Sequence, residues 1–134
     1  GETSGVNVVC KFGQLPPVLM DVHQIESAVV NLVLNAREAM SSPGDIRVET
    51  ALQNGGVLLT VADNGCGMSP EFMANSLFRP FKTTKKNGLG IGMFQTKTII
   101  EAHGGRIVAR SKPGEGTALF VWLPLSPPTA AKNQ

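Results

Sequence analysis

Ile46-Arg-Val-Glu-Thr-Ala-Leu-Gln-Asn-Gly-Gly-Val-Leu-Leu-Thr-Val-Ala62 is the stretch of the sequence that decides the fold. Ile46 to Leu52 predicts a strand, and Asn54-Gly55-Gly56 is typical of a hairpin turn. Val57 to Ala62 is then the return strand, with an aliphatic residue at most of its positions. Such a hairpin predicts an antiparallel sheet with one well-buried face.

Three further strands are expected, one before this hairpin and two after it. The segment from Val6 to Phe12 predicts a strand before it. Closer to the C-terminus, residues 106–111 and 117–123 predict a second hairpin around the turn Lys112-Pro113-Gly114-Glu115-Gly116. A chain with two hairpins does not have the regular alternation of strand and helix that a parallel dinucleotide-binding sheet requires.

A long amphipathic helix is predicted between Asp21 and about Met40. Asp21 is expected to be its N-cap, with Gln24 completing a capping box, and residues 41–44, Ser-Ser-Pro-Gly, end it. Apolar residues recur at steps of four and three along this segment, which predicts one buried stripe. The stripe consists of Ile25, Val29, Leu32, Ala36 and Ala39.

Two more helices are expected in the second half of the chain. A short one follows Pro70 and runs from Glu71 to about Leu77. Residues 79–92 are basic and rich in glycine, and they predict a long mobile loop. A second long helix then runs from Gly92 or Met93 to His103, closed by Gly104-Gly105.

Together these elements predict an α+β fold, a two-layer α/β sandwich whose mostly antiparallel mixed sheet is covered on one face by helices. The chain of 134 residues suits one domain, expected at residues 1–125, with a flexible tail at 126–134. Hydrophobic residues make up 42% and charged residues 16%, which excludes a disordered chain. The net charge of +2 does not indicate nucleic-acid binding.

Asn31 and Asn35 lie four residues apart on the predicted long helix and therefore share one face. A polar stripe on a helix is often its solvated side. Here aliphatic residues flank both asparagines closely, which favours a partly buried position, and a buried amide needs partners. An asparagine oxygen is also a suitable Mg²⁺ ligand when phosphates and waters complete the octahedron.

Two glycine-rich segments suggest a ligand site. Asp63 ends an apolar strand and is followed by Asn64-Gly65-Cys66-Gly67. This is either an ordinary turn or a carboxylate in a pocket, where glycines let a flat ligand approach the backbone. The second segment, residues 88–93, is Gly-Leu-Gly-Ile-Gly-Met and leads into a helix, whose N-terminus can bind phosphate. Four cations stand just before it: Arg79, Lys82, Lys85 and Lys86.

Five segments in this order resemble the N, G1, F, G2 and G3 boxes of the catalytic ATP-binding domain of bacterial sensor histidine kinases. They are Asn31-Leu-Val-Leu-Asn-Ala-Arg-Glu-Ala39, Asp63-Asn-Gly-Cys-Gly-Met68, Leu77-Phe-Arg-Pro-Phe-Lys-Thr-Thr-Lys85, Gly88-Leu-Gly-Ile-Gly-Met93 and Gly114-Glu-Gly-Thr117. That family belongs to the GHKL ATPases, and the match covers about residues 5–125. The resemblance implies a Bergerat fold with a mobile ATP lid.

The resemblance also implies roles for individual residues. Asn35 would ligate Mg²⁺ with Asn31 nearby, and Asp63 would accept from the adenine amino group with Thr117 helping through water. Asn31, Asn35 and Lys85 would be the catalytic residues. The nucleotide-binding set would be Asn35, Glu38, Asp63, Gly65, Gly67, Met68, Phe78, Phe81, Thr83, Thr84, Lys85, Gly88, Leu89, Gly90, Ile91, Gly92, Met93 and Thr117. Many family members carry a basic residue and then a ring where this chain has Glu38 and Ala39.

By the same resemblance, the chain would bind Mg·ATP and donate the γ-phosphoryl group to a histidine. Neither His23 nor His103 has the sequence context of that acceptor, so the expected partner is the histidine-bearing dimerisation domain of the same parent kinase, with a response regulator acting indirectly. The isolated domain is expected to be monomeric, without direct membrane contact. It is expected in the cytoplasm, with a parent that could be anchored in the inner membrane.

The spacing of Cys10 and Cys66 indicates no metal site, and reduced thiols are expected.

Three alternatives remain at this point. Hydrolytic GHKL ATPases hold a glutamate four residues before the magnesium asparagine, where this chain has Asn31, which cannot take a proton at neutral pH. Anti-sigma serine kinases share the boxes but tend to keep that glutamate. The third alternative is a nucleotide-binding module without catalysis.

Overall fold

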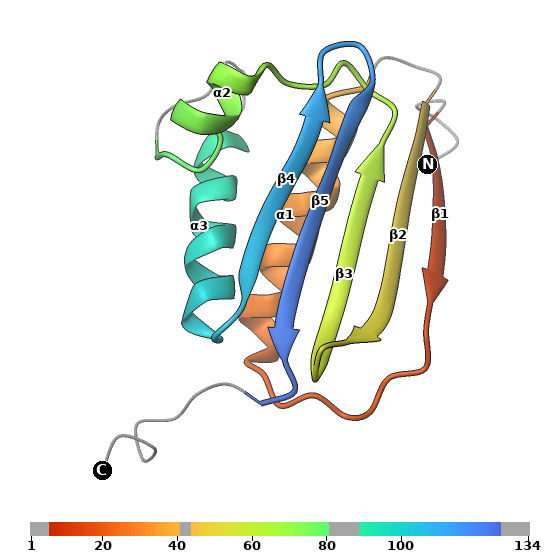
Figure 1. Ribbon diagram of the computed structural model, residues 1–134, viewed down its shortest axis with the longest axis vertical. Helices are drawn as coiled ribbons and strands as arrows, with labels where there is room; N and C mark the ends of the chain where they lie inside the picture. The colour runs from red at the N-terminus through yellow and green to blue at the C-terminus, as the bar shows by residue number, and fades with distance from the viewer. Residues whose placement is uncertain (1–5, 41–43, 81–88, 127–134) are drawn as a thin grey trace.

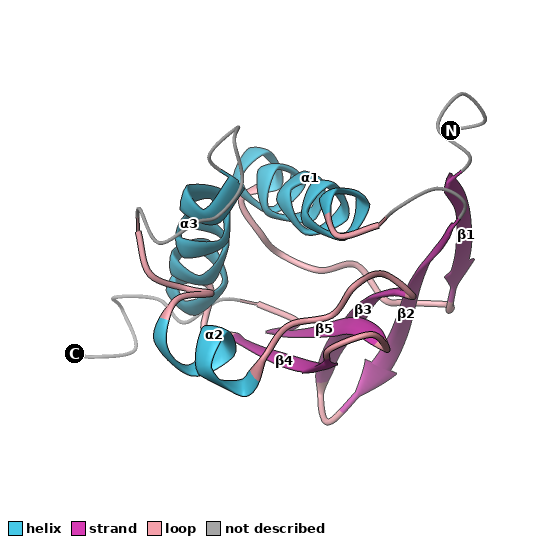
Figure 2. Cartoon of the chain, turned by 90° about the horizontal axis from the view of Figure 1, so that it is seen from above, coloured by secondary structure: helices cyan, strands magenta, loops and turns pink. Residues whose placement is uncertain are grey.

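The computed structural model describes residues 6–40, 44–80 and 89–126, and in the last range it describes side chains from Gly92 onward. Figure 1 shows one sheet with helices behind it, and Figure 2 shows the two layers from above. In chain order the elements are β1 Val6–Phe12, α1 Val22–Glu38, β2 Gly44–Gln53, β3 Gly56–Asp63, α2 Pro70–Asn75, α3 Leu89–Ala102, β4 Arg106–Lys112 and β5 Gly116–Pro124.

The sheet has five strands in the order β1-β2-β3-β5-β4. β1 pairs with β2 in parallel, and the other three pairs are antiparallel. Both predicted hairpins are present, β2–β3 around Asn54-Gly55 and β4–β5 around residues 113–115. The expected two-layer α/β sandwich with a mixed, mostly antiparallel sheet is therefore confirmed.

The core lies between the sheet and helices α1 and α3, which cover one of its faces (Figure 2). Alternation along β3 sends Val57, Leu59 and Val61 into this core, whereas Leu58 and Thr60 lie on the opposite, uncovered face. The largest fully buried side chains among the described residues are Leu32, Ile46, Met93, Ile100, Leu119, Val61, Val121 and Thr96. The buried stripe of α1 includes Ala28, which the sequence pattern missed, and Val29 and Ala39 are only half-buried.

The capping box predicted for α1 is only half present. The Asp21 side chain accepts from the Gln24 N–H at 3.1 Å, as expected of an N-cap. The Asp21 N–H, however, donates to His103 Nε2 at 3.1 Å instead of to Gln24. The other ring nitrogen, Nδ1, lies 2.9 Å from the Ile99 carbonyl, so His103 is buried and joins the end of α3 to the start of α1.

Two helix boundaries differ from the sequence-based prediction. α3 begins at Leu89, three residues before Gly92, so residues 89–91 are helical and not part of a loop. Glycine has a poor intrinsic helix propensity, which is why Gly90 and Gly92 suggested a later start. α2 covers only Pro70–Asn75, with Ser69 as its N-cap, and ends before Leu77, which is buried.

Candidate functional site

Asp63 lies at the last position of β3, on the face of the sheet that carries the helices. Its Oδ1 accepts from the Gly65 N–H at 2.8 Å, which turns the chain sharply after the strand. The register places Asp63 opposite Thr117 of β5, and Thr117 is opposite Ser111 of β4. A carboxylate and two hydroxyls therefore share one row across three strands.

Ser111 connects this row to the loop that follows Asp63. Its Oγ accepts from the Met68 N–H and donates to the Gly116 carbonyl, both at 2.8 Å. The same Oγ lies 2.8 Å from Thr117 Oγ1. Ser111 was not among the predicted site residues, although the expected hairpin already placed it opposite Thr117.

Two glycines allow the segments of the site to pack closely. Gly67 has φ of +74° and Gly116 has φ of +90°, a region that side chains rarely adopt. A Cβ on Gly67 would meet the Lys112 carbonyl, and one on Gly116 would meet the Asp63 carbonyl. The Gly114 N–H also donates to the Cys66 carbonyl at 2.7 Å. The loop after β3 is thus held against the β4–β5 turn by backbone contacts.

The same loop is attached to the C-terminal end of α1. The Cys66 N–H donates to the Ala39 carbonyl at 2.9 Å, one turn beyond Asn35. Asn35 is only 5% exposed. Asn31, one turn earlier, is half-buried, and its Nδ2 donates to the Gly92 carbonyl of α3 at 3.4 Å. Asn31 therefore joins the two long helices, and Asn35 is carried toward the loop after β3.

Other predicted residues take positions around these helices. Met93 is 1% exposed and belongs to the core, while Met68 is half-buried against it. Phe78, also half-buried, packs under the Lys97 ammonium, which lies 5.2 Å from the ring centroid. Glu38 is exposed at the end of α1.

The remaining predicted residues are those whose side chains the structure does not describe. For Leu89, Gly90 and Ile91 only the backbone is described, and it forms the first turn of α3. Phe81, Thr83, Thr84, Lys85 and Gly88 lie outside the described residues, as does the middle of the expected mobile loop 79–92. Of the expected basic cluster, only Arg79 is described, and it is exposed.

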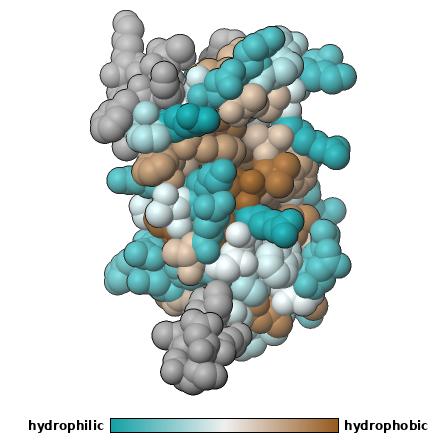
Figure 3. Space-filling view, turned by 60° about the vertical axis from the view of Figure 1, so that its left-hand side comes forward, coloured by the Kyte–Doolittle hydropathy of each residue, from teal (hydrophilic) through white to brown (hydrophobic). Residues whose placement is uncertain are grey.

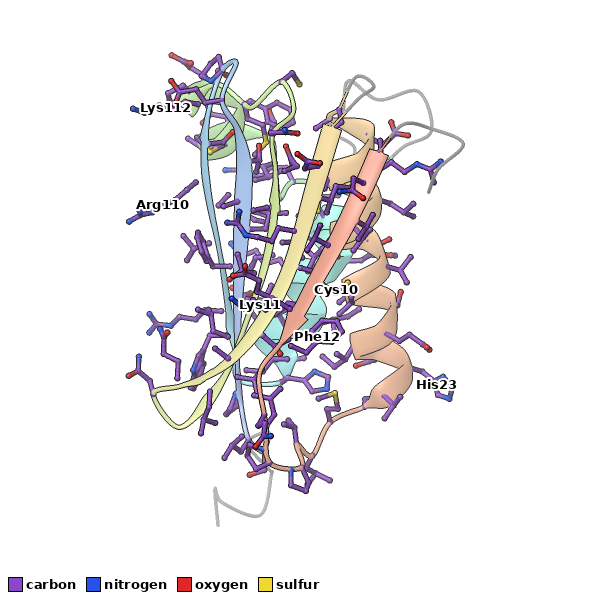
Figure 4. All side chains as sticks on the ribbon, turned by 90° about the vertical axis from the view of Figure 1, so that its right-hand side faces the viewer. Cys10, Lys11, Phe12, His23, Arg110 and Lys112 are labelled. Carbon is purple, nitrogen blue, oxygen red and sulfur yellow. The ribbon has the colours of Figure 1, made fainter. Side chains whose placement is uncertain are left out.

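A hollow of about 670 Å³ opens on the uncovered face of the sheet, behind the row that contains Asp63. Arg47, Ala62, Ala118 and Arg110 lie side by side across its floor. Figure 4 shows Arg110 and Lys112 extending from this face, away from α1. Figure 3 shows apolar surface with hydrophilic residues around it on the side of α2 and α3. Asp63, Ser111 and Thr117 also border the hollow, but their strand positions direct the side chains to the other face, so the hollow is separate from the candidate site.

Within the described residues, no three His, Cys, Asp or Glu side chains come close enough together to hold a metal ion. Cys10 and Cys66 are free thiols, both exposed. None of the described helices is long and apolar enough to cross a membrane. The groups that the candidate site brings together are one carboxylate, hydroxyl and amide groups, and the backbone of glycine-rich segments.

The sequence matches known proteins along most of its length. Residues 20–127 match the family model described as histidine kinase-, DNA gyrase B-, and HSP90-like ATPase. The chain is 38% identical over 128 residues to the alginate biosynthesis sensor protein KinB of Pseudomonas aeruginosa, which covers 93% of this chain and 21% of that protein. It is 39% identical over 132 residues to sensor histidine kinase TmoS of Ectopseudomonas mendocina, covering 93% of this chain and 14% of that protein. The chain therefore spans about a fifth or less of these relatives.

Solved structures give the same result for the fold. The catalytic domain of histidine kinase ThkA superposes with a TM-score of 0.81 at 27% identity, covering 92% of this chain and 81% of that one. A mycobacterial sensor histidine kinase, MprB, superposes with a TM-score of 0.81 at 23% identity, covering 95% and 87%.

Proposed function

The chain belongs to the family of histidine kinase-, DNA gyrase B- and HSP90-like ATPases and corresponds to the catalytic ATPase domain of sensor histidine kinases, and from this we propose that it binds Mg·ATP and donates the γ-phosphoryl group to a histidine on a separate dimerisation domain. The transfer breaks the bond between the γ-phosphorus and the β–γ bridging oxygen, forms a phosphorus–nitrogen bond on the imidazole and releases ADP. Residues 1–125 would make up this domain, with 126–134 as a tail.

The position of Asp63 is the single observation that carries the proposal. An ionised carboxylate only accepts hydrogen bonds, and Asp63 holds its loop through Gly65 while lying beside Thr117. The adenine amino group is a donor and fits such an acceptor. Gly65, Gly67 and Met68 would line the pocket, because their loop is fixed to the Ala39 carbonyl and to Ser111.

Asn35 is the residue proposed to hold Mg²⁺. Its amide oxygen is the kind of ligand that Mg²⁺ accepts when phosphate oxygens and waters supply the rest of the octahedron. The burial of Asn35 in the last turns of α1, next to the loop after β3, supports this position. Bound there, the ion would neutralise charge on the transferred phosphoryl group.

The phosphates are proposed to lie at the N-terminus of α3. The helix begins at Leu89, so the free N–H groups of its first turn come from the glycine-rich segment 88–92. Lys85, Thr83 and Thr84 would add contacts from the preceding segment, Phe78 and Phe81 would anchor the lid, and Glu38 would lie at the opposite edge.

The acceptor histidine is proposed to lie outside this chain. Both ring nitrogens of His103 are engaged, by the Asp21 N–H and the Ile99 carbonyl, and the ring is buried. His23 is exposed on the first turn of α1, at the end of the helix opposite Asn35. The proposed partners are the dimerisation domain of the parent kinase and, through it, a response regulator. The parent is expected in the cytoplasm or anchored to the inner membrane.

Asn31 favours phosphoryl transfer to protein over hydrolysis of ATP. An amide cannot act as a general base for water. The Asn31 Nδ2 is also used to bind the Gly92 carbonyl, which gives this position a structural role between α1 and α3.

Two measurements, of nucleotide binding and of phosphoryl transfer, test the proposal. Calorimetry should detect binding of Mg·ATP but much weaker binding of Mg·GTP, because guanine presents an acceptor oxygen to Asp63, and Asp63→Ala should abolish ATP binding while the chain stays folded. Incubation with γ-labelled ATP should leave the chain unlabelled until a histidine-bearing dimerisation domain is added. Equal affinity for the two nucleotides, or acid-labile label on His23 or His103, would contradict the proposal.

A further inference from the structure

The hydroxyl of Ser111 is fully used by its neighbours. It accepts from the Met68 N–H, donates to the Gly116 carbonyl and lies 2.8 Å from Thr117 Oγ1. Met68 belongs to the loop after β3, and Gly116 and Thr117 both belong to strand β5, so this one serine of β4 joins three segments of the candidate site.

The direction of the bond between the two hydroxyls follows once the single Ser111 proton is assigned to the Gly116 carbonyl. A serine hydroxyl has one proton, and a carbonyl oxygen can only accept. The Ser111 proton is therefore directed to Gly116, which leaves the Thr117 proton as the one between Oγ1 and Ser111 Oγ. Thr117 Oγ1 then offers only lone pairs to any other partner.

We propose that Ser111 is a positioning residue for base selection, because it holds Thr117 as a hydrogen-bond acceptor beside the acceptor Asp63. This inference rests on the proposed nucleotide site. With both groups accepting, the site favours a base edge that carries a 6-amino donor. A 6-oxo purine would place an oxygen lone pair against two acceptors, and an unpaired buried acceptor is costly.

The test compares ATP with inosine triphosphate, which carries a 6-oxo group in place of the 6-amino group. In Ser111→Ala the Thr117 hydroxyl can turn and donate to the 6-oxo oxygen. The ratio of the two dissociation constants, measured by calorimetry on the 134-residue chain, should then shift toward inosine triphosphate by about 5- to 10-fold, the change expected for one hydrogen bond.

Three variants separate this effect from loss of structure. Ser111→Thr retains the hydroxyl and should retain the wild-type ratio. Val108→Ala weakens the same strand from the uncovered face, where Val108 is 53% exposed, and should leave the ratio unchanged. Adding Thr117→Val to Ser111→Ala removes the hydroxyl that turns, and the gain for inosine triphosphate should disappear. If Ser111→Ala does not fold, Ser111→Cys, whose sulfur is a weak acceptor, should shift the ratio in the same direction.

A purely structural role for Ser111 predicts a different result. Both nucleotides would then bind more weakly by the same factor, and that outcome would overturn the inference. Failure of the proposed function has its own signature, since the wild-type chain would not bind ATP or Asp63→Ala would bind it unchanged.

Discussion

The two ends of the sheet use polar groups in different ways. At the end that carries Asp63, hydroxyls and glycine-rich backbone hold a carboxylate at the candidate site. At the other end, His103 binds the Asp21 N–H, and the Trp122 indole donates to the Gln53 carbonyl at 2.8 Å. The polar groups of this far end pair with one another and stabilise the frame. Similar hydrogen bonds therefore shape the candidate site at one end and stabilise the frame at the other.

The largest effect is expected from Gly116→Ala at the site end. Alanine would be strained at φ of +90°, and its Cβ would overlap the Asp63 carbonyl. Unfolding by denaturant should show a loss of about 3 kcal/mol or more, and ATP binding should be lost as well.

Gly114→Ala is the matched control in the same turn. Gly114 has φ of +81°, but a Cβ there would meet no atom within 4 Å. Only backbone strain remains, so a loss of roughly 1 kcal/mol is expected with ATP affinity retained. Equal losses for the two variants would show that the contact between the turn and Asp63 is unimportant.

The next largest effect is expected from Asn35→Ala, on the Mg²⁺-dependent binding of ATP. If Asn35 holds Mg²⁺, affinity for Mg·ATP should fall by about tenfold or more, the factor for one charge-assisted contact. Affinity for ADP without metal should change little, because the contacts at Asp63 remain. Titrations with and without Mg²⁺ measure the difference, and an unchanged magnesium dependence would place the ion elsewhere.

His103→Ala should separate stability from binding at the far end. The substitution leaves the Asp21 N–H without its partner, which should lower the free energy of unfolding by about 1–3 kcal/mol. ATP affinity should stay close to that of the wild type, because His103 lies at the opposite end of α3 from Gly92. His23→Ala, at an exposed site, is the control and should change neither quantity. A loss of ATP affinity in His103→Ala would break the division between the two ends.

The smallest effect is expected from Thr96→Val in the middle of α3. Thr96 is 0% exposed, and within the described part of the chain its Oγ1 has no hydrogen-bond partner. A valine of nearly the same shape should raise the free energy of unfolding by about 1 kcal/mol. The exposed Thr98, whose Oγ1 donates to the Phe94 carbonyl, is the comparison site, and Thr98→Val should not stabilise the chain.

Periodicity and turn chemistry predicted the layers, both hairpins and the N-cap of α1, because these depend on residues close together in sequence. The family resemblance supplied the candidate residues. Contacts between distant segments were not predictable in this way. The Asp21 N–H bonds to a histidine 82 positions away, so local pattern assigned that role to Gln24. The start of α3 was placed late because the propensity of glycine was weighed without tertiary contacts such as the Asn31–Gly92 bond.

Ser111 is a residue of the candidate site that the sequence pattern did not single out. Its position opposite Thr117 followed from the predicted hairpin, yet a serine in a strand has no distinctive signature. Only the three distances of 2.8 Å identify its hydroxyl as the point where the site segments meet.

The bond between Asp21 and His103 also bears on the order in which the chain folds. It joins residues 82 positions apart, and the segment between them contains α1, β2, β3, α2 and α3. Closing so long a loop costs entropy that is recovered only after the enclosed strands and helices have packed. We therefore expect the bond to form after the rate-limiting step of folding. Its removal would then accelerate unfolding and leave the refolding rate nearly unchanged.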